Sequence, residues 1–395
     1  MAKFKRLHLS VFIIVMAALN YCFLRSNKEI RPRNHSIVST HVRNNTSTTK
    51  QRAVLLAGPH KTASTSIQAN LFLWANDPNH SSGLSKSWSL PTPFEKLIEH
   101  GCLVKNTFEL RRRSHVYWAI SAIRGNKEKI KCMIGPNGDI RYSFDEFLQF
   151  YKEEYYEQWI KGKNLAIASE GMDEVGNVKK GKEILQHILE LLPWNSDILP
   201  HVSGSNEDIT VVVVYRSPRS IHLQSLWHQC CMQNEPFEEY LATVNSRTWF
   251  PFHYLDSLNL AHKFIQGGLK TIIIDMAGVY NKGYDISNVV ACDILGANCT
   301  PQKHFFGHSD EQPSKANVKN ATHSVTQEQM KMIDEAFENY ECKFLPLEDN
   351  PNLTILYQDA LSRVFSKCRE RPVNSSTILD KKGLLDMIVQ IAKNV

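Results

Sequence analysis

Several short motifs that mark enzyme classes are missing from this sequence of 395 residues. It has nine cysteines but no Cys-x-x-Cys pair, which disfavours a zinc site or a thioredoxin-like redox site. It has no Asp-x-Asp motif and no other group of residues with metal-ligand spacing, so we expect no required metal ion. There is no internal repeat, and a composition with 42% hydrophobic residues excludes a collagen-like or mainly disordered chain.

Acidic residues are almost absent from the N-terminal segment. Residues 1–52 contain ten lysines and arginines but only one acidic residue, Glu29. Residues 53–395 contain 36 basic and 39 acidic residues, so the formal net charge of +6 comes from the N-terminal segment. A general nucleic-acid-binding protein would carry positive charge over its folded part, so we expect no nucleic-acid partner.

A hydrophobic run, Leu7–Leu24, contains no aspartate, glutamate, lysine or arginine. Its 18 residues would form a helix of about 27 Å, close to the thickness of a bilayer core. It predicts a single-pass signal-anchor, and a cleaved signal peptide is the alternative. Basic residues lie on both sides, so charge alone does not decide the orientation. In both cases the rest of the chain enters the secretory lumen.

Two further features agree with a lumenal location. Asn-x-Ser/Thr sequons, which are acceptors for N-glycosylation, occur at Asn34, Asn44, Asn45, Asn79, Asn298, Asn320, Asn352 and Asn374. The cysteine content fits an oxidising compartment, where Cys292 could pair with Cys299 and Cys342 with Cys368. The segment 25–51 is rich in polar residues and predicts a disordered, glycosylated stem.

The remainder predicts an α/β fold. Four short apolar runs predict buried parallel strands: Ala53–Ala57, Leu165–Ser169, Ile209–Tyr215 and Thr271–Asp275. Helical patterns lie between and after them: Ser64–Ala75, Phe144–Ile160, Lys180–Leu192, Pro218–Cys230, Phe252–Gln266, Gln327–Tyr340 and Leu353–Lys367. Strands that alternate with helices predict a three-layer domain with a mainly parallel central sheet. We assign residues 1–6 to a basic tail, 7–24 to the anchor, 52–370 to this domain and 371–395 to a C-terminal extension.

The first predicted strand leads into a loop suited to an anion. Gly58-Pro59 forms a tight turn, and His60-Lys61-Thr62-Ala63-Ser64-Thr65-Ser66 opens an amphipathic helix. Free N–H groups and the dipole at a helix N-terminus attract anions, and Lys61 adds a positive charge. The loop does not match the Gly-x-x-x-x-Gly-Lys-Ser/Thr motif, which disfavours a nucleoside triphosphatase.

A second motif follows the strand Ile209–Tyr215. Arg216-Ser217-Pro218 ends that strand and opens the next helix. An arginine at the carboxyl end of a central strand stands where α/β folds place their ligands, and its planar guanidinium suits a phosphate. The two motifs together predict a site for two phosphate-like groups.

These motifs resemble those of carbohydrate sulfotransferases that use 3′-phosphoadenosine 5′-phosphosulfate, which are type II Golgi membrane proteins with a P-loop-like fold. The resemblance covers roughly residues 52–368. It implies that Gly58 and Lys61–Ser66 bind the 5′-phosphosulfate, with Ala63 where glycine is usual. It implies that Arg216 and Ser225 bind the 3′-phosphate, although Ser225 stands one residue later than the family pattern. The activity implied is sulfuryl transfer to a hydroxyl or amine of a glycan, with no metal.

The acceptor must lose a proton to a general base. Glu170 is the first candidate, because it follows the strand Leu165–Ser169 and would share the sheet edge with both motifs. His60 is the rival, and His115 and His222 are weaker candidates. Two alternatives stay open: a lumenal glycosyltransferase that uses a nucleotide sugar, and a catalytically inactive glycan-binding protein on the same fold.

Overall fold

The computed structural model describes about half of the chain. The described residues, with short gaps inside some ranges, are 51–58, 62, 67, 70, 71, 74, 83–89, 157–192, 208–247, 252–299, 325–370 and 378–393. The predicted anchor and nearly all of the predicted stem lie outside them. Among the described residues, no helix is long and apolar enough to cross a membrane.

The centre of the fold is a six-stranded sheet with the order β2-β3-β1-β4-β5-β6, and every neighbouring pair is parallel. The strands are β1 (Ala53–Gly58), β2 (Trp88–Ser89), β3 (Asn164–Ala168), β4 (Ile209–Tyr215), β5 (Lys270–Asp275) and β6 (Leu353–Leu356). The predicted α/β class and mainly parallel sheet are confirmed. The four predicted strands match β1, β3, β4 and β5 to within one residue at each end.

The sheet is buried on both faces, which explains its almost unbroken apolar strands. Alternate strand residues enter two separate cores. Leu55, Ile167 and Val211 belong to the larger core, whereas Val54, Leu56 and Val212 belong to the smaller one. The description as a three-layer domain therefore fits, with helices on each side of the sheet.

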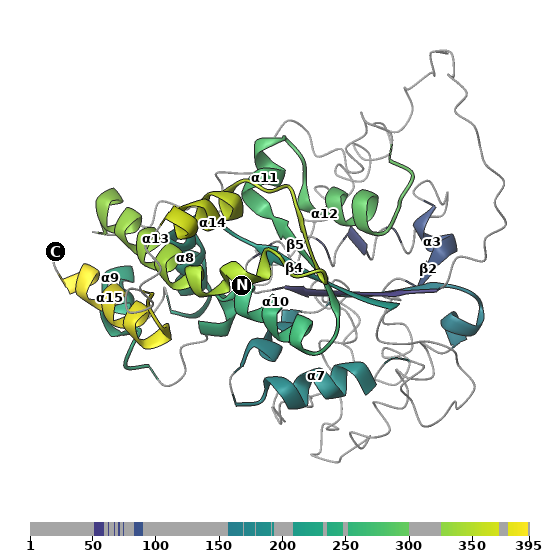
Figure 1. Ribbon diagram of the computed structural model, residues 1–395, viewed down its shortest axis with the longest axis horizontal. Coiled ribbons are helices and arrows are strands. Elements are labelled where there is room, and N and C mark those ends of the chain that lie inside the picture. Colours follow the sequence, from purple (N-terminus) through teal and green to yellow (C-terminus); the bar gives the residue numbers. More distant parts are fainter. Residues whose placement is uncertain are drawn as a thin grey trace, which may run out of the picture. The chain divides into compact units, whose positions relative to one another are not determined.

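The larger core is covered by α7 (Gly181–Glu190), α8 (Arg219–Cys230), α9 (Phe237–Thr243), α10 (Ser257–Gln266), α13 (Gln327–Glu341), α14 (Ala360–Glu370) and α15 (Lys381–Lys393). The smaller core is covered by α3 (Leu84–Ser87), α11 (Met276–Asn281), α12 (Ile286–Val289) and the π-helix η7 (Val290–Ile294). The described helical positions after β1, namely Ile67, Leu71 and Trp74, also belong to the smaller core. Figure 1 shows α7 and α10 on one side of the sheet and α11 and α12 on the other.

The C-terminal segment contributes to the larger core. In α15 the residues Leu384, Leu385, Ile388, Val389, Ile391 and Ala392 are buried. The helix packs against α13 and α9, and the Gln329 side-chain amide of α13 donates to the carbonyl of Ile391 over 3.0 Å. Residues 381–393 thus form an integral part of the helical layer.

The predicted helix Leu353–Lys367 is wrong in its first turn. Leu353–Leu356 instead forms the edge strand β6, which pairs with β5 from Thr271 to Ile274. The helix α14 begins only at Ala360, after Tyr357, whose φ of 59° ends the strand. The Asp275 carboxylate at the end of β5 accepts hydrogen bonds from the N–H groups of Asp359 and Leu361, which fixes the start of α14.

The predicted helix Phe252–Gln266 is also wrong, because it is two elements. A 3₁₀ turn, η6 (Phe252–Tyr254), is followed by α10, which begins at Ser257. The break falls at Asp256, whose side chain accepts a hydrogen bond from the N–H of Asn259 and caps the new helix.

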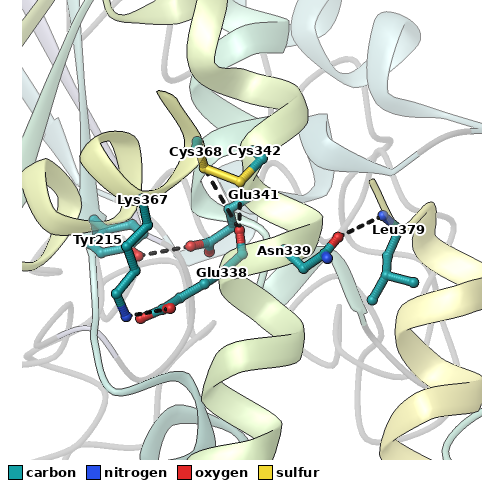
Figure 2. Close-up of a disulfide and its surroundings, with 8 residues drawn as sticks. All are labelled: Tyr215, Glu338, Asn339, Glu341, Cys342, Lys367, Cys368 and Leu379. Atoms are coloured by element: carbon teal, nitrogen blue, oxygen red, sulfur yellow. Dashed lines mark hydrogen bonds and ion pairs between the residues drawn. A yellow bond between two sulfur atoms is a disulfide. The ribbon is translucent and has the colours of Figure 1, made fainter. Parts of the chain in front are cut away.

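Two disulfides join both pairs that the sequence suggested. Cys292–Cys299 has a Cα–Cα distance of 5.8 Å, and Cys342–Cys368 has one of 5.2 Å. The second bridge links the residue after α13, where the 3₁₀ helix η9 (Cys342–Leu347) begins, to the last turn of α14. Figure 2 shows it beside Glu341 at the end of α13.

Candidate functional site

The strand order places a candidate site at the carboxyl ends of β1 and β4. After β1, the chain forms β2 and β3, which lie on one side of β1 in the sheet. It then crosses to the other side, where it forms β4, β5 and β6. In open α/β sheets, ligands bind outside the carboxyl ends of the strands where the strand order reverses. In this sheet that position is the end of β1, which carries the first predicted motif.

The end of β1 is shaped by a glycine. Gly58 has a φ of 93°, a backbone conformation that strains any residue with a side chain. Gly58 pairs with Val213, and the register shifts between Leu56 and Gly58. Glycine therefore allows the chain to turn sharply out of the sheet at the switch point.

Of the predicted phosphosulfate loop, the structure describes Gly58 and Thr62. Thr62 is fully buried, and together with Gly58, Ala168 and Val214 it lines a small cavity between the ends of β1, β3 and β4. His60, Lys61, Ala63, Ser64, Thr65 and Ser66 lie outside the described residues. Helical positions at Ile67, Leu71 and Trp74 agree with a helix that starts after this loop.

Arg216 stands directly after the last residue of β4, as the sequence predicts. It is half-buried, and its burial lowers the pKa of its guanidinium, while the nearby Tyr280 phenol opposes that change. Partial desolvation and the nearby Asp285 carboxylate raise the pKa of Tyr280 to about 12, although its side chain is 38% exposed. Because β1 and β4 are parallel and Gly58 pairs with Val213, three residues before Arg216, Gly58 and Arg216 both lie at the carboxyl edge of these adjacent strands. An anion at this edge would offset the desolvation of the guanidinium.

Ser225 lies on α8, two turns after Arg216. It is half-buried, and its hydroxyl donates to the carbonyl of Ile221, one turn earlier, over 3.0 Å. Serine hydroxyls in helices often make this local bond to a backbone carbonyl when no other acceptor is bound. Of the weaker base candidates, His222 on the same helix is fully buried, and His115 lies outside the described residues.

Glu170 begins a 3₁₀ helix, η3 (Glu170–Gly176), two residues after the described end of β3 at Ala168. Its backbone is therefore at the carboxyl edge of the sheet, as predicted. Its side chain lies outside the described residues.

The structure brings together a buried group that sequence reasoning missed. Glu174 of η3 contacts His253 of η6, with Oε1 and Nε2 2.9 Å apart, and the Tyr254 hydroxyl donates to the same oxygen over 3.2 Å. Their separation of 79 residues in sequence leaves no local signal. The Ser257 hydroxyl donates to the carbonyl of Val214, which places the turn before α10 near the carboxyl end of β4.

This group has the donor set of a cation site. Asp173, Glu174 and His253 each offer one ligand atom, and these atoms lie within 4.8 Å of one another. Carboxylate oxygen and imidazole nitrogen suit several divalent cations. The expectation that no metal-ligand cluster exists was based on spacing in the sequence, which cannot detect such a long-range group.

Comparison with known proteins found no matching family model, no matching curated protein and no matching solved structure.

Proposed function

We propose that this protein is a sulfotransferase that moves a sulfuryl group from 3′-phosphoadenosine 5′-phosphosulfate to a glycan hydroxyl or amine. The observation that carries the proposal is the parallel pairing of β1 and β4, because the two predicted anion-binding motifs begin at the carboxyl ends of these strands. Gly58 at the end of β1 opens the predicted phosphosulfate loop, and Arg216 directly follows the adjacent strand β4. A donor with a 5′-phosphosulfate and a separate 3′-phosphate needs two such sites side by side. The P-loop-like sulfotransferase fold is part of this proposal.

The proposed reaction is an in-line displacement. The acceptor oxygen or nitrogen attacks the sulfur as the bond between sulfur and the phosphate oxygen breaks, and the acceptor proton passes to the base. Lys61 neutralises the charge that develops on the leaving oxygen, and backbone N–H groups of residues 62–66 hold the 5′-phosphate. Glu170 is the proposed base, and His60 is its rival. Arg216, with Ser225, holds the 3′-phosphate.

The proposed location is the Golgi membrane, with an N-terminal anchor and a lumenal catalytic domain. The disulfides Cys292–Cys299 and Cys342–Cys368 support an oxidising compartment. The eight sequons and the apolar segment 7–24 support the secretory pathway. Secretion after cleavage of that segment is the alternative.

One observation favours the glycosyltransferase alternative. Many transferases that use nucleotide sugars need a divalent cation to hold the diphosphate, and Asp173, Glu174 and His253 form a candidate cation site near the same sheet edge. In the sulfotransferase these residues need no metal. Dependence on Mn²⁺ therefore separates the two functions.

The test uses the full-length glycosylated chain, purified in detergent. A ligand at 100 times its dissociation constant stabilises a protein by about 2.7 kcal/mol. We expect 3′-phosphoadenosine 5′-phosphate to raise the melting temperature without metal, and a radiolabelled donor to transfer sulfate to a panel of glycans. A rise only with a nucleotide sugar and Mn²⁺ would identify a glycosyltransferase. A rise with neither would favour the inactive glycan-binding protein.

Two variants assign the roles within this site. Arg216→Ala should weaken binding of the bisphosphate by roughly 10- to 150-fold, the loss of one charge-assisted bond. Arg363→Ala removes an exposed arginine of α14 and is the matched control. Lys61→Ala should abolish turnover and leave the melting temperature unchanged. Full turnover of this variant at saturating donor would remove Lys61 from the mechanism.

A further inference from the structure

The turn that carries Arg216 is held by a helix from the C-terminal third of the chain. Glu341, the last residue of α13, accepts hydrogen bonds from Arg219 Nε over 2.6 Å and from the Tyr215 hydroxyl over 2.8 Å. The side chains of Arg219 and Glu341 are only 3% and 2% exposed, so water does not screen this ion pair. Figure 2 shows Glu341 reaching from α13 toward Tyr215.

Both partners of Glu341 flank Arg216. Tyr215 directly precedes it, and Arg219 follows it by three residues. Arg219 also donates from Nη1 to the backbone carbonyl of Arg216 over 3.2 Å, and its guanidinium lies 4.1 Å from the centre of the Tyr215 ring. One buried carboxylate therefore fixes the backbone on each side of Arg216.

A second residue of α13 holds the start of α8. Asp334, seven residues before Glu341, lies about two turns away and so on the same face of the helix. Its carboxylate accepts from the Ser220 N–H over 2.7 Å and from the Ser220 hydroxyl over 2.9 Å. The N-cap residue of α8 is Pro218, whose side chain makes no capping bond. Asp334 thus supplies from another helix the cap that α8 lacks.

The charges of this network agree with a positioning role. Burial alone would lower the pKa of Arg219, but the Glu341 carboxylate, with Tyr215 and Asp256, raises it overall. The Arg219 guanidinium is thus fully charged, and its buried ion pair with Glu341 holds it in place. Arg216, at the same turn, is only half-buried. A buried ion pair is a weak source of stability, but it can specify one geometry.

The C-terminal end of α13 is held in place by contacts with α14. Cys342, next to Glu341, is joined to Cys368 of α14, and Lys367 of α14 contacts the Glu338 carboxylate over 2.7 Å. Figure 2 shows both links on the side of α13 that faces α14. These contacts fix the last turn of α13, from which Glu341 extends.

We infer that Glu341 and Asp334 are positioning residues for Arg216 and thereby set the affinity for the 3′-phosphate of the donor. This inference rests on the proposed function. It makes a prediction that a purely structural role does not make. Loss of the network should lower the affinity for ligands that carry a 3′-phosphate and leave the affinity for ligands without one unchanged.

The experiment measures dissociation constants by calorimetry on the full-length chain. The two probes are 3′-phosphoadenosine 5′-phosphate and adenosine 5′-phosphate. Glu341→Gln should weaken the bisphosphate by about 3- to 30-fold, which is within the range of coupling between contacting residues, and the monophosphate by less than twofold. Glu335→Gln is the control, since it removes the same charge from an exposed position of the same helix, where the Glu335 carboxylate lies 3.9 Å from Lys331 of α13 itself. It should change neither constant.

A double variant tests whether the effect passes through Arg216. In the Arg216→Ala background, Glu341→Gln should cause no further loss of bisphosphate affinity. An equal loss for both probes, or a further loss in that background, would overturn the inference. If Glu341→Gln does not fold, Asp334→Asn gives the same comparison from a less buried position. If the wild type binds no bisphosphate, the proposed function fails. If Arg216→Ala weakens binding and the α13 variants do not, only the positioning role fails.

Discussion

Replacement of Arg219 by methionine should be among the most destabilising single changes in the described part of the protein. Arg219→Met keeps most of the aliphatic stem but leaves the Glu341 carboxylate 2% exposed without its cationic partner, with the Tyr215 hydroxyl as a hydrogen-bond donor. Loss of one partner from a buried ion pair costs about 3–5 kcal/mol. Because both side chains are almost fully buried, this figure needs no reduction for solvent screening.

The same reasoning predicts that a second change rescues the first. Glu341→Gln in the Arg219→Met background removes the isolated charge, and the amide oxygen can still accept from Tyr215. We expect the double variant to be only about 1–2 kcal/mol less stable than the wild type, because neutral replacements of buried pairs are well tolerated. The coupling energy should then be at least about 2 kcal/mol.

The assay is reversible denaturation of the full-length chain by urea, with far-ultraviolet circular dichroism as the signal. The four proteins of the cycle are measured under identical conditions. Equal slopes with denaturant would show that the unfolded states are comparable. A double variant whose loss equals the sum of the two single losses would refute the claim that Arg219 and Glu341 act as one buried unit.

Three other predictions concern separate parts of the molecule. Glu170→Gln should lower turnover by about 10²- to 10⁴-fold with donor affinity unchanged, and a loss below about threefold would transfer the role of base to His60. Serine at both Cys342 and Cys368 should lower stability by roughly 3–4 kcal/mol, because the bridge closes a loop with a sequence separation of 26, and equal urea midpoints would contradict this. His262 has a pKa below its usual value through burial and the nearby Lys263 and Lys343, so its folded form disfavours the proton. Wild type should therefore lose stability relative to His262→Gln as the pH falls from about 7 to about 5, and parallel melting curves for the two would refute it.

The sequence predicts the central sheet well because its signals are local. Ile209–Tyr215 contains four consecutive valines and is found at the predicted bounds. The glycine and the arginine that end β1 and β4 are also local signals, since each follows an apolar run directly. The parallel pairing of those two strands then brings the motifs together at one edge.

The failures have a different physical origin. The hydrophobic pattern of Leu353–Leu356 predicts the start of a helix, but pairing with β5 makes this segment a strand. A break at Asp256 also escapes a periodicity argument, because a single capping bond decides it. The Glu174–His253 contact and the support of α8 by α13 span 79 and more than 110 residues. Motif spacing and hydrophobic periodicity describe neighbours within a few residues, so they cannot detect contacts over such separations.

The location of the supporting residues bears on how a donor site at Arg216 would form. Strands β1 and β4 bring Gly58 and Arg216 to one edge as soon as they pair, and this needs only residues before 216. The backbone around Arg216 is held by the Glu341 and Asp334 carboxylates of α13, which belong to the last third of the chain. Because Glu341 adjoins Cys342, the disulfide with Cys368 joins this support to α14. On the proposed function, the affinity for the 3′-phosphate is therefore completed only when the last third of the chain has folded.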